Sequence, residues 1–182
     1  MWAEKFFQNA PNSRWYGIES SRYSWNMKQA VQLDEVDRRL LRALQEDATL
    51  STAALAERVG ASATSCWRRI KALEDVGVLK QSVRLVDPDG VGRGVSVMLQ
   101  VRMKAHSLEK HHDFERFVRA RAEVMECYSM SGEWDYLLRI VVADVAAYQR
   151  FLMEELLTFP DVATSASHFA LSQVKYTTAV PV

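Results

Sequence analysis

Residues 51–77 constrain the fold of this chain more than any other segment, because they predict two short helices joined by a tight turn. Ser51 is placed to cap a first helix whose buried stripe contains Leu55 and Val59, one turn apart. Gly60 then interrupts the helical pattern, and a second capped helix follows. This spacing is typical of a DNA-reading helix-turn-helix.

The second helix of this segment is expected to present a polar and basic face to solvent. Ser62 caps it, and Cys66, Ile70 and Leu73 recur at helical spacing on its buried face. The remaining positions can reach phosphates and base edges in a major groove, with the basic residues mainly on phosphates. The predicted DNA-contacting residues are Ser62, Thr64, Ser65, Trp67, Arg68, Arg69 and Lys71.

Local charge supports DNA binding by this segment. Residues 62–86 contain five basic and two acidic residues, a local charge of +3 in a chain whose formal net charge is zero. A chain without an overall excess of positive charge cannot coat nucleic acid indiscriminately, so its basic footprint must be local. The alternative interpretation is an ordinary helical hairpin whose basic residues only solvate one face.

Length and composition indicate a soluble globular protein. The 182 residues are 48% hydrophobic and 25% charged, which is ordinary for such a protein and gives room for two small domains. No apolar run approaches the roughly 20 residues that span a bilayer, and the N-terminus lacks the apolar core of a signal peptide. Cys66 and Cys127 lie on predicted apolar faces, and buried free thiols indicate a reducing compartment. We therefore expect a cytoplasmic protein.

The N-terminal half divides into an extension and a helical domain. Residues 1–30 contain three of the five tryptophans and lack an apolar period until about residue 27, so we expect a disordered extension. Residues 31–87 are expected to form the DNA-binding domain, beginning with a helix capped by Asp34. Val83 and Leu85 alternate with polar residues, which predicts a strand over residues 78–86 that serves as a wing or a connector.

A turn and three glycines over residues 87–94 predict a domain boundary, and residues 95–182 read as a second domain. Its predicted elements are a strand at 95–103, a helix at 108–122, strands at 124–130 and 135–142, a helix at 144–156 and a strand at 162–176. The order βαββαβ predicts a ferredoxin-like antiparallel sheet with both helices on one face. Apolar side chains on the other face favour pairing with a second copy.

The chain resembles the Lrp/AsnC family of transcriptional regulators, leucine-responsive and asparagine-responsive, over about residues 33–182. Four stretches carry the resemblance: LDEVDRRLLRALQEDATLSTAALAERVGASATSCWRRIKALEDVGVL, DPDGVG, SGEWDYLLRIVV and QVKYTTAVPV. It implies an α+β protein with an N-terminal winged helix-turn-helix domain and a C-terminal ferredoxin-like domain for effector binding and oligomerisation. It also implies homodimers that assemble further, and control of genes for amino-acid metabolism or transport.

The turn at residues 131–135, Ser131 to Asp135, is the candidate effector site. Gly132 permits close backbone approach, so an N–H group can meet a ligand carboxylate, while Glu133 or Asp135 can meet an ammonium group. Trp134 can form a wall of the pocket or cover the subunit interface. The alternative is that Gly132 only makes the hairpin and Asp135 caps it. Weaker candidates for polar contacts are Thr164, Ser165 and Ser167. With the resemblance, an amino-acid effector at a dimer–dimer interface becomes the leading hypothesis.

The context of a glycine cluster and a histidine cluster argues against a phosphate or metal site. The glycines at 90, 92 and 94 lack the spacing and helix of a phosphate loop. His106, His111 and His112 lack acidic or thiol partners at metal-ligand spacing. We therefore expect no metal, no cofactor, no catalytic residue and no membrane partner.

The predicted partners are double-stranded DNA, a small effector and a second copy of the chain. Two alternatives to an effector-controlled regulator stay open. One is an architectural DNA-binding protein without an effector, and the other is an enzyme similar to the sirohaem decarboxylases, which look like the same architecture.

Overall fold

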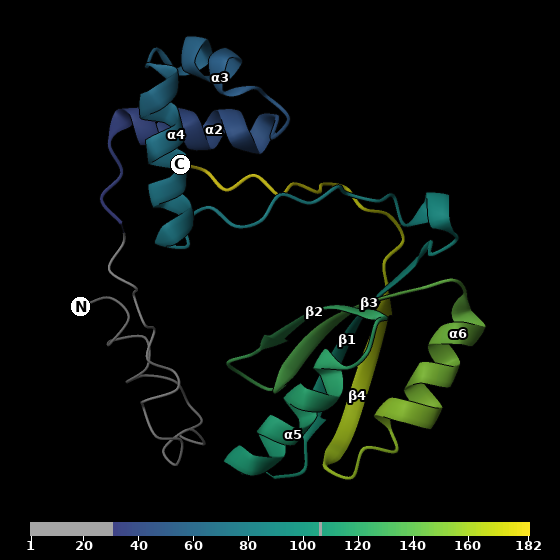
Figure 1. Ribbon diagram of the computed structural model, residues 1–182. Coiled ribbons are helices and arrows are strands. Elements are labelled where there is room, and N and C mark those ends of the chain that lie inside the picture. The colour runs from purple at the N-terminus through teal and green to yellow at the C-terminus, as the bar shows by residue number, and fades with distance from the viewer. Residues whose placement is uncertain (1–30, 106) are drawn as a thin grey trace. The chain divides into compact units, whose positions relative to one another are not determined.

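The computed structural model describes residues 31–105 and 107–182, which form two compact units (Figure 1). The first contains the described residues up to Ser82 together with Thr177–Val182, and the second contains Val83–Tyr176. The chain therefore changes unit before the predicted linker at 87–94, and it returns to the first unit at its C-terminal end. The extension predicted at 1–30 lies outside the described residues, as does His106.

Three helices build the first unit: α2 (Glu35–Glu46), α3 (Thr52–Val59) and α4 (Ala63–Asp75). The predicted N-caps are confirmed, because the side chains of Asp34, Ser51 and Ser62 each accept a hydrogen bond from a backbone N–H three residues further on. The core of the unit is formed by Leu40, Ala43, Leu55, Ala56, Val59 and Cys66. The predicted stripe residues Leu55, Val59 and Cys66 are part of this core, which fixes the face of α4 that remains outside.

The strand predicted at residues 78–86 is not formed in the single chain. Gly77 ends the α4 region with φ 74°, a left-handed conformation that glycine adopts without steric cost. The residues that follow have extended sequence character but no neighbouring strand, and a strand needs a partner for its backbone hydrogen bonds. Val83, Leu85 and Val86 are consequently 66%, 63% and 66% exposed.

The C-terminal tail packs against α2 within the first unit. The side-chain amide of Gln45 donates to the carbonyl of Val180 (3.0 Å) and accepts from its N–H (2.6 Å). Arg42 Nε donates to the Val182 carbonyl at 2.8 Å. No sequence pattern predicted this contact.

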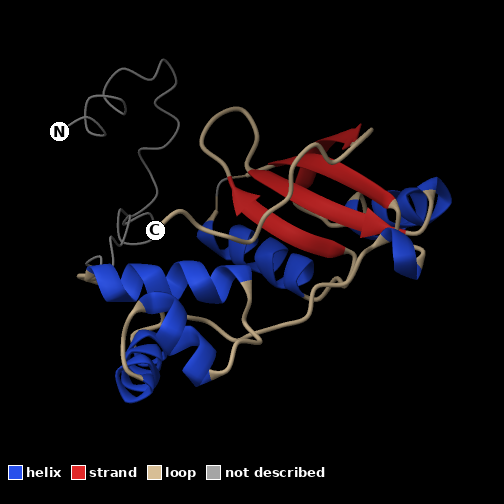
Figure 2. Ribbon diagram, turned by 90° about the horizontal axis from the view of Figure 1, so that it is seen from above, coloured by secondary structure: helices blue, strands red, loops and turns tan. Residues whose placement is uncertain are grey.

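The second unit is a four-stranded sheet with helices on one face (Figure 2). Its elements in chain order are η1 (Asp89–Val91), β1 (Val95–Met103), α5 (Leu108–Arg119), β2 (Val124–Ser129), β3 (Tyr136–Val142), α6 (Val145–Arg150), η2 (Phe151–Leu156) and β4 (Val162–Phe169). The strand order is β2-β3-β1-β4, and every pair is antiparallel. The predicted ferredoxin-like topology is confirmed.

Alternation along β1 separates the two faces of this sheet. Val97, Leu99 and Val101 are fully buried on the helix side, together with Leu138 and Ile140 of β3. The residues between them lie on the opposite face, which α5 and α6 leave uncovered. That open face carries Met98, Gln100, Arg102, Leu137, Arg139 and Val141.

Three sequence predictions for this unit need correction. β4 ends at Phe169 instead of 176, because its partner β1 begins at Val95 and offers no ladder further on. The helix predicted at 144–156 divides into α6 and the π-helical η2, where Leu157 N–H donates to the Leu152 carbonyl. Cys127 is exposed at the edge strand, whereas Cys66 is buried as expected.

Over residues 31–105 and 107–182, no helix is long and apolar enough to cross a bilayer.

Candidate functional site

The solvent-facing side of α4 brings together a threonine, a tryptophan and an arginine. Thr64 and Arg68 are exposed one turn apart, and Trp67 between them is 64% exposed. Within the described part of the chain, Arg68 makes no hydrogen bond and no ion pair. Ser65 donates its N–H to the Ser62 hydroxyl at 3.2 Å, so Ser62 serves as the cap of the helix. This exposed set of Thr64, Trp67 and Arg68 is therefore available to a ligand approaching the start of α4.

Arg69 was expected to point outward, but the structure turns it toward the beginning of α2. Its Nη1 lies 2.7 Å from Asp34 Oδ2 and 2.7 Å from Asp37 Oδ1. The Arg69 side chain is 24% exposed, and that of Asp37 is 15% exposed. These contacts tie α4 to the first turn of α2, so Arg69 orients the helix that carries the exposed set.

Lys71 lies on the exposed side of α4 with two acidic neighbours. Its Nζ is 3.6 Å from Glu74 and 3.4 Å from Asp75, and these carboxylates, Asp75 foremost, raise the pKa of Lys71. Exposed ion pairs of this kind contribute little to stability. Lys71 can therefore exchange these carboxylates for a phosphate at small cost.

The contact between Asp34 and Arg69 predicts an acid-sensitive fold of the first unit. The pKa of Asp34 is lowered from 3.8 by the Asp37 N–H and by the Arg69 guanidinium. A lowered folded pKa stabilises the fold above the unfolded value and loses that contribution as pH falls through the folded value. We expect the stability difference between the parent chain and Asp34→Asn to shrink on going from pH 7 to about pH 3.

Urea unfolding at several pH values measures this difference, since asparagine still caps the helix but carries no charge. Glu57→Gln is the matched control, because Glu57 is an exposed carboxylate of the same unit whose side chain has no partner among the described residues. A difference between parent and Asp34→Asn that stays constant with pH contradicts the electrostatic role of Asp34.

In the second unit, the predicted turn at 131–135 is a hairpin closed by its own backbone. Met130 N–H donates to the Asp135 carbonyl at 2.9 Å, and Gly132 has φ 130°, where other residues are strained. Ser131, Gly132 and Glu133 are exposed at its tip. The hairpin therefore presents backbone and one carboxylate side chain to solvent between β2 and β3.

Asp135 instead turns inward. The residue is 7% exposed, and its Oδ2 accepts the Met103 N–H at 2.7 Å. Met103 lies where the pairing of β1 with β4 changes register after Arg102, so its N–H is satisfied by a side chain. The Asp135 carboxylate thus fixes the end of β1 against the hairpin.

Arg102 of β1, which was not among the residues predicted from the sequence, contacts the hairpin. Its Nη2 lies 2.5 Å from Glu133 Oε1, its Nε donates to the Glu133 carbonyl at 3.1 Å, and its guanidinium stacks 5.0 Å from the Trp134 ring centroid. The sequence feature that could have identified Arg102 was its place in the strand's alternation, because it falls on the solvent side of β1. A guanidinium and a carboxylate side by side offer partners for both charges of a free amino acid.

The three candidates on β4 separate in the structure. Thr164 pairs directly with Arg102 across the sheet, which places both side chains on the open face. Ser165 pairs with Val101 on the helix side. Ser167 lies 2.5 Å from the Tyr148 hydroxyl of α6. Only Thr164 of these three adjoins the Arg102–Glu133 pair.

His111 packs against the core of the second unit: its Nδ1 is 2.7 Å from the Tyr136 hydroxyl. No group of three or more potential metal ligands occurs among the described residues.

Comparisons with known proteins cover both units. An AsnC-type helix-turn-helix domain model matches residues 33–74, and a model of the Lrp/AsnC ligand-binding domain matches residues 96–180. The DNA-binding transcriptional activator DecR of Escherichia coli is 41% identical over 150 residues, covering 82% of this chain and 99% of that protein. The glutamate uptake regulatory protein of Zymomonas mobilis is 38% identical over 149 residues, covering 82% and 90%.

Solved structures show the same similarity. An AsnC family regulator from Agrobacterium tumefaciens is 45% identical with a TM-score of 0.78. A transcriptional regulator from Neisseria meningitidis, solved as a complex with L-Met, is 35% identical with a TM-score of 0.79. Each comparison covers 82% of this chain and 97% of the other.

Proposed function

Because this chain belongs to the Lrp/AsnC family of transcriptional regulators, we propose that it binds specific DNA sites and that a free amino acid controls this binding. The observation that carries the proposal is the pairing of two features on separate units. One is the exposed set of Thr64, Trp67 and Arg68 on α4. The other is the opposite-charge pair of Arg102 and Glu133.

DNA recognition is assigned to α4. Arg68 and Lys71 bind phosphates, Thr64 and Ser65 lie nearer the base edges, and Trp67 covers the sugar-phosphate surface beside them. Arg69 acts through its contacts with α2, which hold α4 at a fixed angle.

The effector site is assigned to the hairpin and the open face. Arg102 binds the ligand carboxylate, Glu133 binds its ammonium group, and Trp134 and Thr164 border the head group. The names of the relatives support an amino acid, since one regulates glutamate uptake and a solved neighbour holds L-Met. Target genes for amino-acid uptake or metabolism follow as part of the same proposal.

A second copy of the chain completes the molecule in this proposal. The open face of the sheet and the exposed extended segment with Val83 and Leu85 both lack a partner in the described chain. A two-fold dimer pairs such surfaces with themselves, and its two α4 helices then read half-sites about 10 base pairs apart or a multiple of that.

The proposed function is tested by selecting binding sites from a random duplex pool and measuring affinity with each of the amino acids present. We expect enriched sites with two-fold symmetry and at least one amino acid that changes the affinity. Enriched sites without any amino-acid response favour the architectural alternative, and no enrichment contradicts DNA recognition. The relatives are regulators, so we propose a protein without catalytic activity.

Arg68→Ala is expected to make DNA binding weaker and less dependent on salt. Each phosphate contact contributes about −0.9 to the slope of log affinity against log salt concentration, so losing one flattens the slope by about that amount. Fluorescence anisotropy on a selected duplex over a salt series measures the slope. Arg150→Ala is the control, because Arg150 is an exposed arginine of the other unit. A folded Arg68→Ala chain with the parent slope contradicts the assignment of α4 to the groove.

A further inference from the structure

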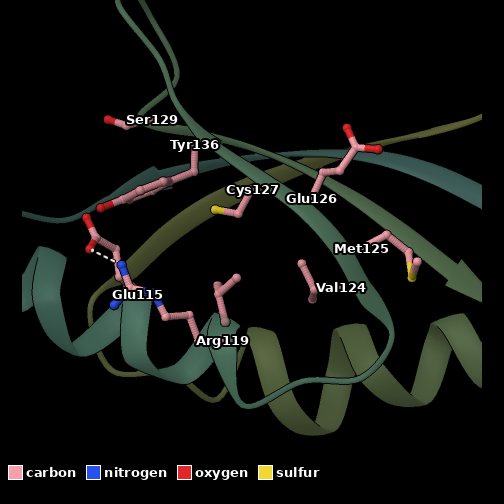
Figure 3. Close-up of a pocket in the computed structure, with 9 residues that line it drawn as sticks. Glu115, Arg119, Val124, Met125, Glu126, Cys127, Ser129 and Tyr136 are labelled. Carbon is pink, nitrogen blue, oxygen red and sulfur yellow. Dashed lines mark hydrogen bonds and ion pairs between the residues drawn. The ribbon is translucent and has the colours of Figure 1, made fainter. Parts of the chain in front are cut away.

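A hollow of about 420 Å³ lies between α5 and β2, on the helix side of the sheet. Small-molecule sites typically have volumes of roughly 300–1,000 Å³. Figure 3 shows Val124 and Cys127 directed from β2 toward α5, with Glu115 and Arg119 on the helix opposite. Neither the proposed DNA site nor the proposed effector site uses any of these residues.

Part of the lining of the hollow is apolar. Val118 of α5 and Val124 of β2 contribute to it, and Met125, 56% exposed, adds a flexible thioether. Although Cys127 is exposed as a residue at the strand edge, partial desolvation of its thiol, and secondarily the charge of Glu115, raise its pKa to about 11, so this thiol is neutral at physiological pH. The surroundings suit an uncharged hydrocarbon body.

The hollow is lined by two carboxylates and one guanidinium. Glu126 is paired with Arg139 of β3, so Glu115 and Arg119 are the charged pair that remains for a ligand. Glu115 Oε2 and Arg119 Nη2 are 3.2 Å apart on successive turns of α5, and their side chains are 34% and 76% exposed. An exposed pair at this spacing contributes little to stability, so its groups can exchange partners with a ligand. A free amino acid presents an ammonium and a carboxylate at comparable spacing.

We propose that this hollow is a second amino-acid site, which takes a zwitterionic amino acid with an apolar side chain. The ligand ammonium meets Glu115, its carboxylate meets Arg119, and its side chain lies over Val118 and Val124. The site is separate from the Arg102–Glu133 pair, because Cys127 pairs with Leu138 on the helix side, whereas Arg102 lies on the open face. Each copy of the chain then binds two amino acids at independent positions.

The test uses the full chain with its methionine methyl groups labelled with ¹³C, and reads the Met125 resonance, identified by its loss in Met125→Leu. The probes are L-leucine, L-isoleucine and L-phenylalanine, with N-acetyl-L-leucine as the analogue that lacks the ammonium group. We expect a saturable shift of the Met125 methyl with at least one amino acid, at a Kd of about 1 mM or tighter. N-acetyl-L-leucine should bind at least about tenfold more weakly than L-leucine.

Two variants of α5 give a matched comparison. Glu115→Gln/Arg119→Gln removes this charged pair and is expected to weaken binding by about tenfold or more. Asp113→Asn/Arg116→Gln removes a neighbouring exposed ion pair that does not line the hollow, and should leave the Kd unchanged. Arg102→Ala should also leave the Met125 titration unchanged.

Three results overturn the proposal. One is the absence of a saturable Met125 shift with all three amino acids, which includes the case of a hollow covered by another copy of the chain. Another is an unchanged Kd in Glu115→Gln/Arg119→Gln. The third is loss of the Met125 shift in Arg102→Ala. That result would mean that the ligand binds at the hairpin and affects Met125 only indirectly.

Discussion

Arg102→Ala is expected to weaken effector binding by about tenfold to a hundredfold, the loss of one charge-assisted hydrogen bond to a carboxylate. The guanidinium of Arg102 is oriented by Glu133 and by the Trp134 ring, so it is held in position before a ligand arrives. DNA affinity without effector should remain within about threefold of the parent, because α4 belongs to the other unit. Calorimetry with the amino acid that changes DNA affinity most, and anisotropy with a selected duplex, measure the two quantities.

The control for Arg102 is Arg139→Ala. Arg139 Nε lies 2.6 Å from Glu126 Oε1 on the same open face, so this variant also removes one arginine–glutamate pair from the sheet. It should leave the affinity for the effector unchanged. Equal losses of affinity in both variants attribute the effect to the open face as a whole, and parent affinity in Arg102→Ala contradicts the assignment of the carboxylate-binding group.

The fold was predictable from sequence wherever a local rule and the burial pattern agree. The caps at Asp34, Ser51 and Ser62 are short-range features, and the alternation of β1 specifies which residues face the helices. The segments that differ from prediction depend on a partner. Residues 78–86 alternate like a strand but have no neighbouring strand, and β4 ends where β1 can no longer pair with it.

Contacts between distant residues could not be derived from periodicity. Helical phase placed Arg69 outside, and only the approach of α2 shows that Asp34 and Asp37 draw it inward. The tail contact is similar, because Gln45 binds the backbone of Val180, and backbone groups leave no signature in the side-chain pattern. The hairpin at 131–135 was identified by residue type, whereas Arg102 belongs to the candidate site because of its contacts with Glu133 and Trp134.

Asp135 illustrates how one residue type supports two interpretations of a site. A carboxylate beside a glycine turn predicts a ligand group, yet here the carboxylate accepts a backbone N–H at a register shift. Its contribution to an effector site is then indirect, through the position of the hairpin. This distinction makes separate predictions for stability and for ligand binding.

Asp135→Ala is therefore expected to destabilise the second unit by about 2–3 kcal/mol, since it leaves the buried Met103 N–H without its acceptor. Hydrogen exchange of the Met103 amide should accelerate by roughly 30- to 150-fold, which is the same free energy expressed as an opening equilibrium. Asp135→Asn retains an acceptor oxygen and should lose less than half of this stability.

Glu133→Ala is the control from the same hairpin, because this carboxylate is 74% exposed and its removal should change stability by less than about 0.5 kcal/mol. Variants of Asp135 and Glu133 should therefore affect different quantities: the first lowers stability, and the second lowers effector binding. Asp135→Asn is expected to keep effector binding, whereas Glu133→Ala loses it while remaining fully folded. An unchanged exchange rate of the Met103 amide in Asp135→Ala would show that the carboxylate does not hold this strand end. Asp135 would then be assigned as a group that binds the ligand directly.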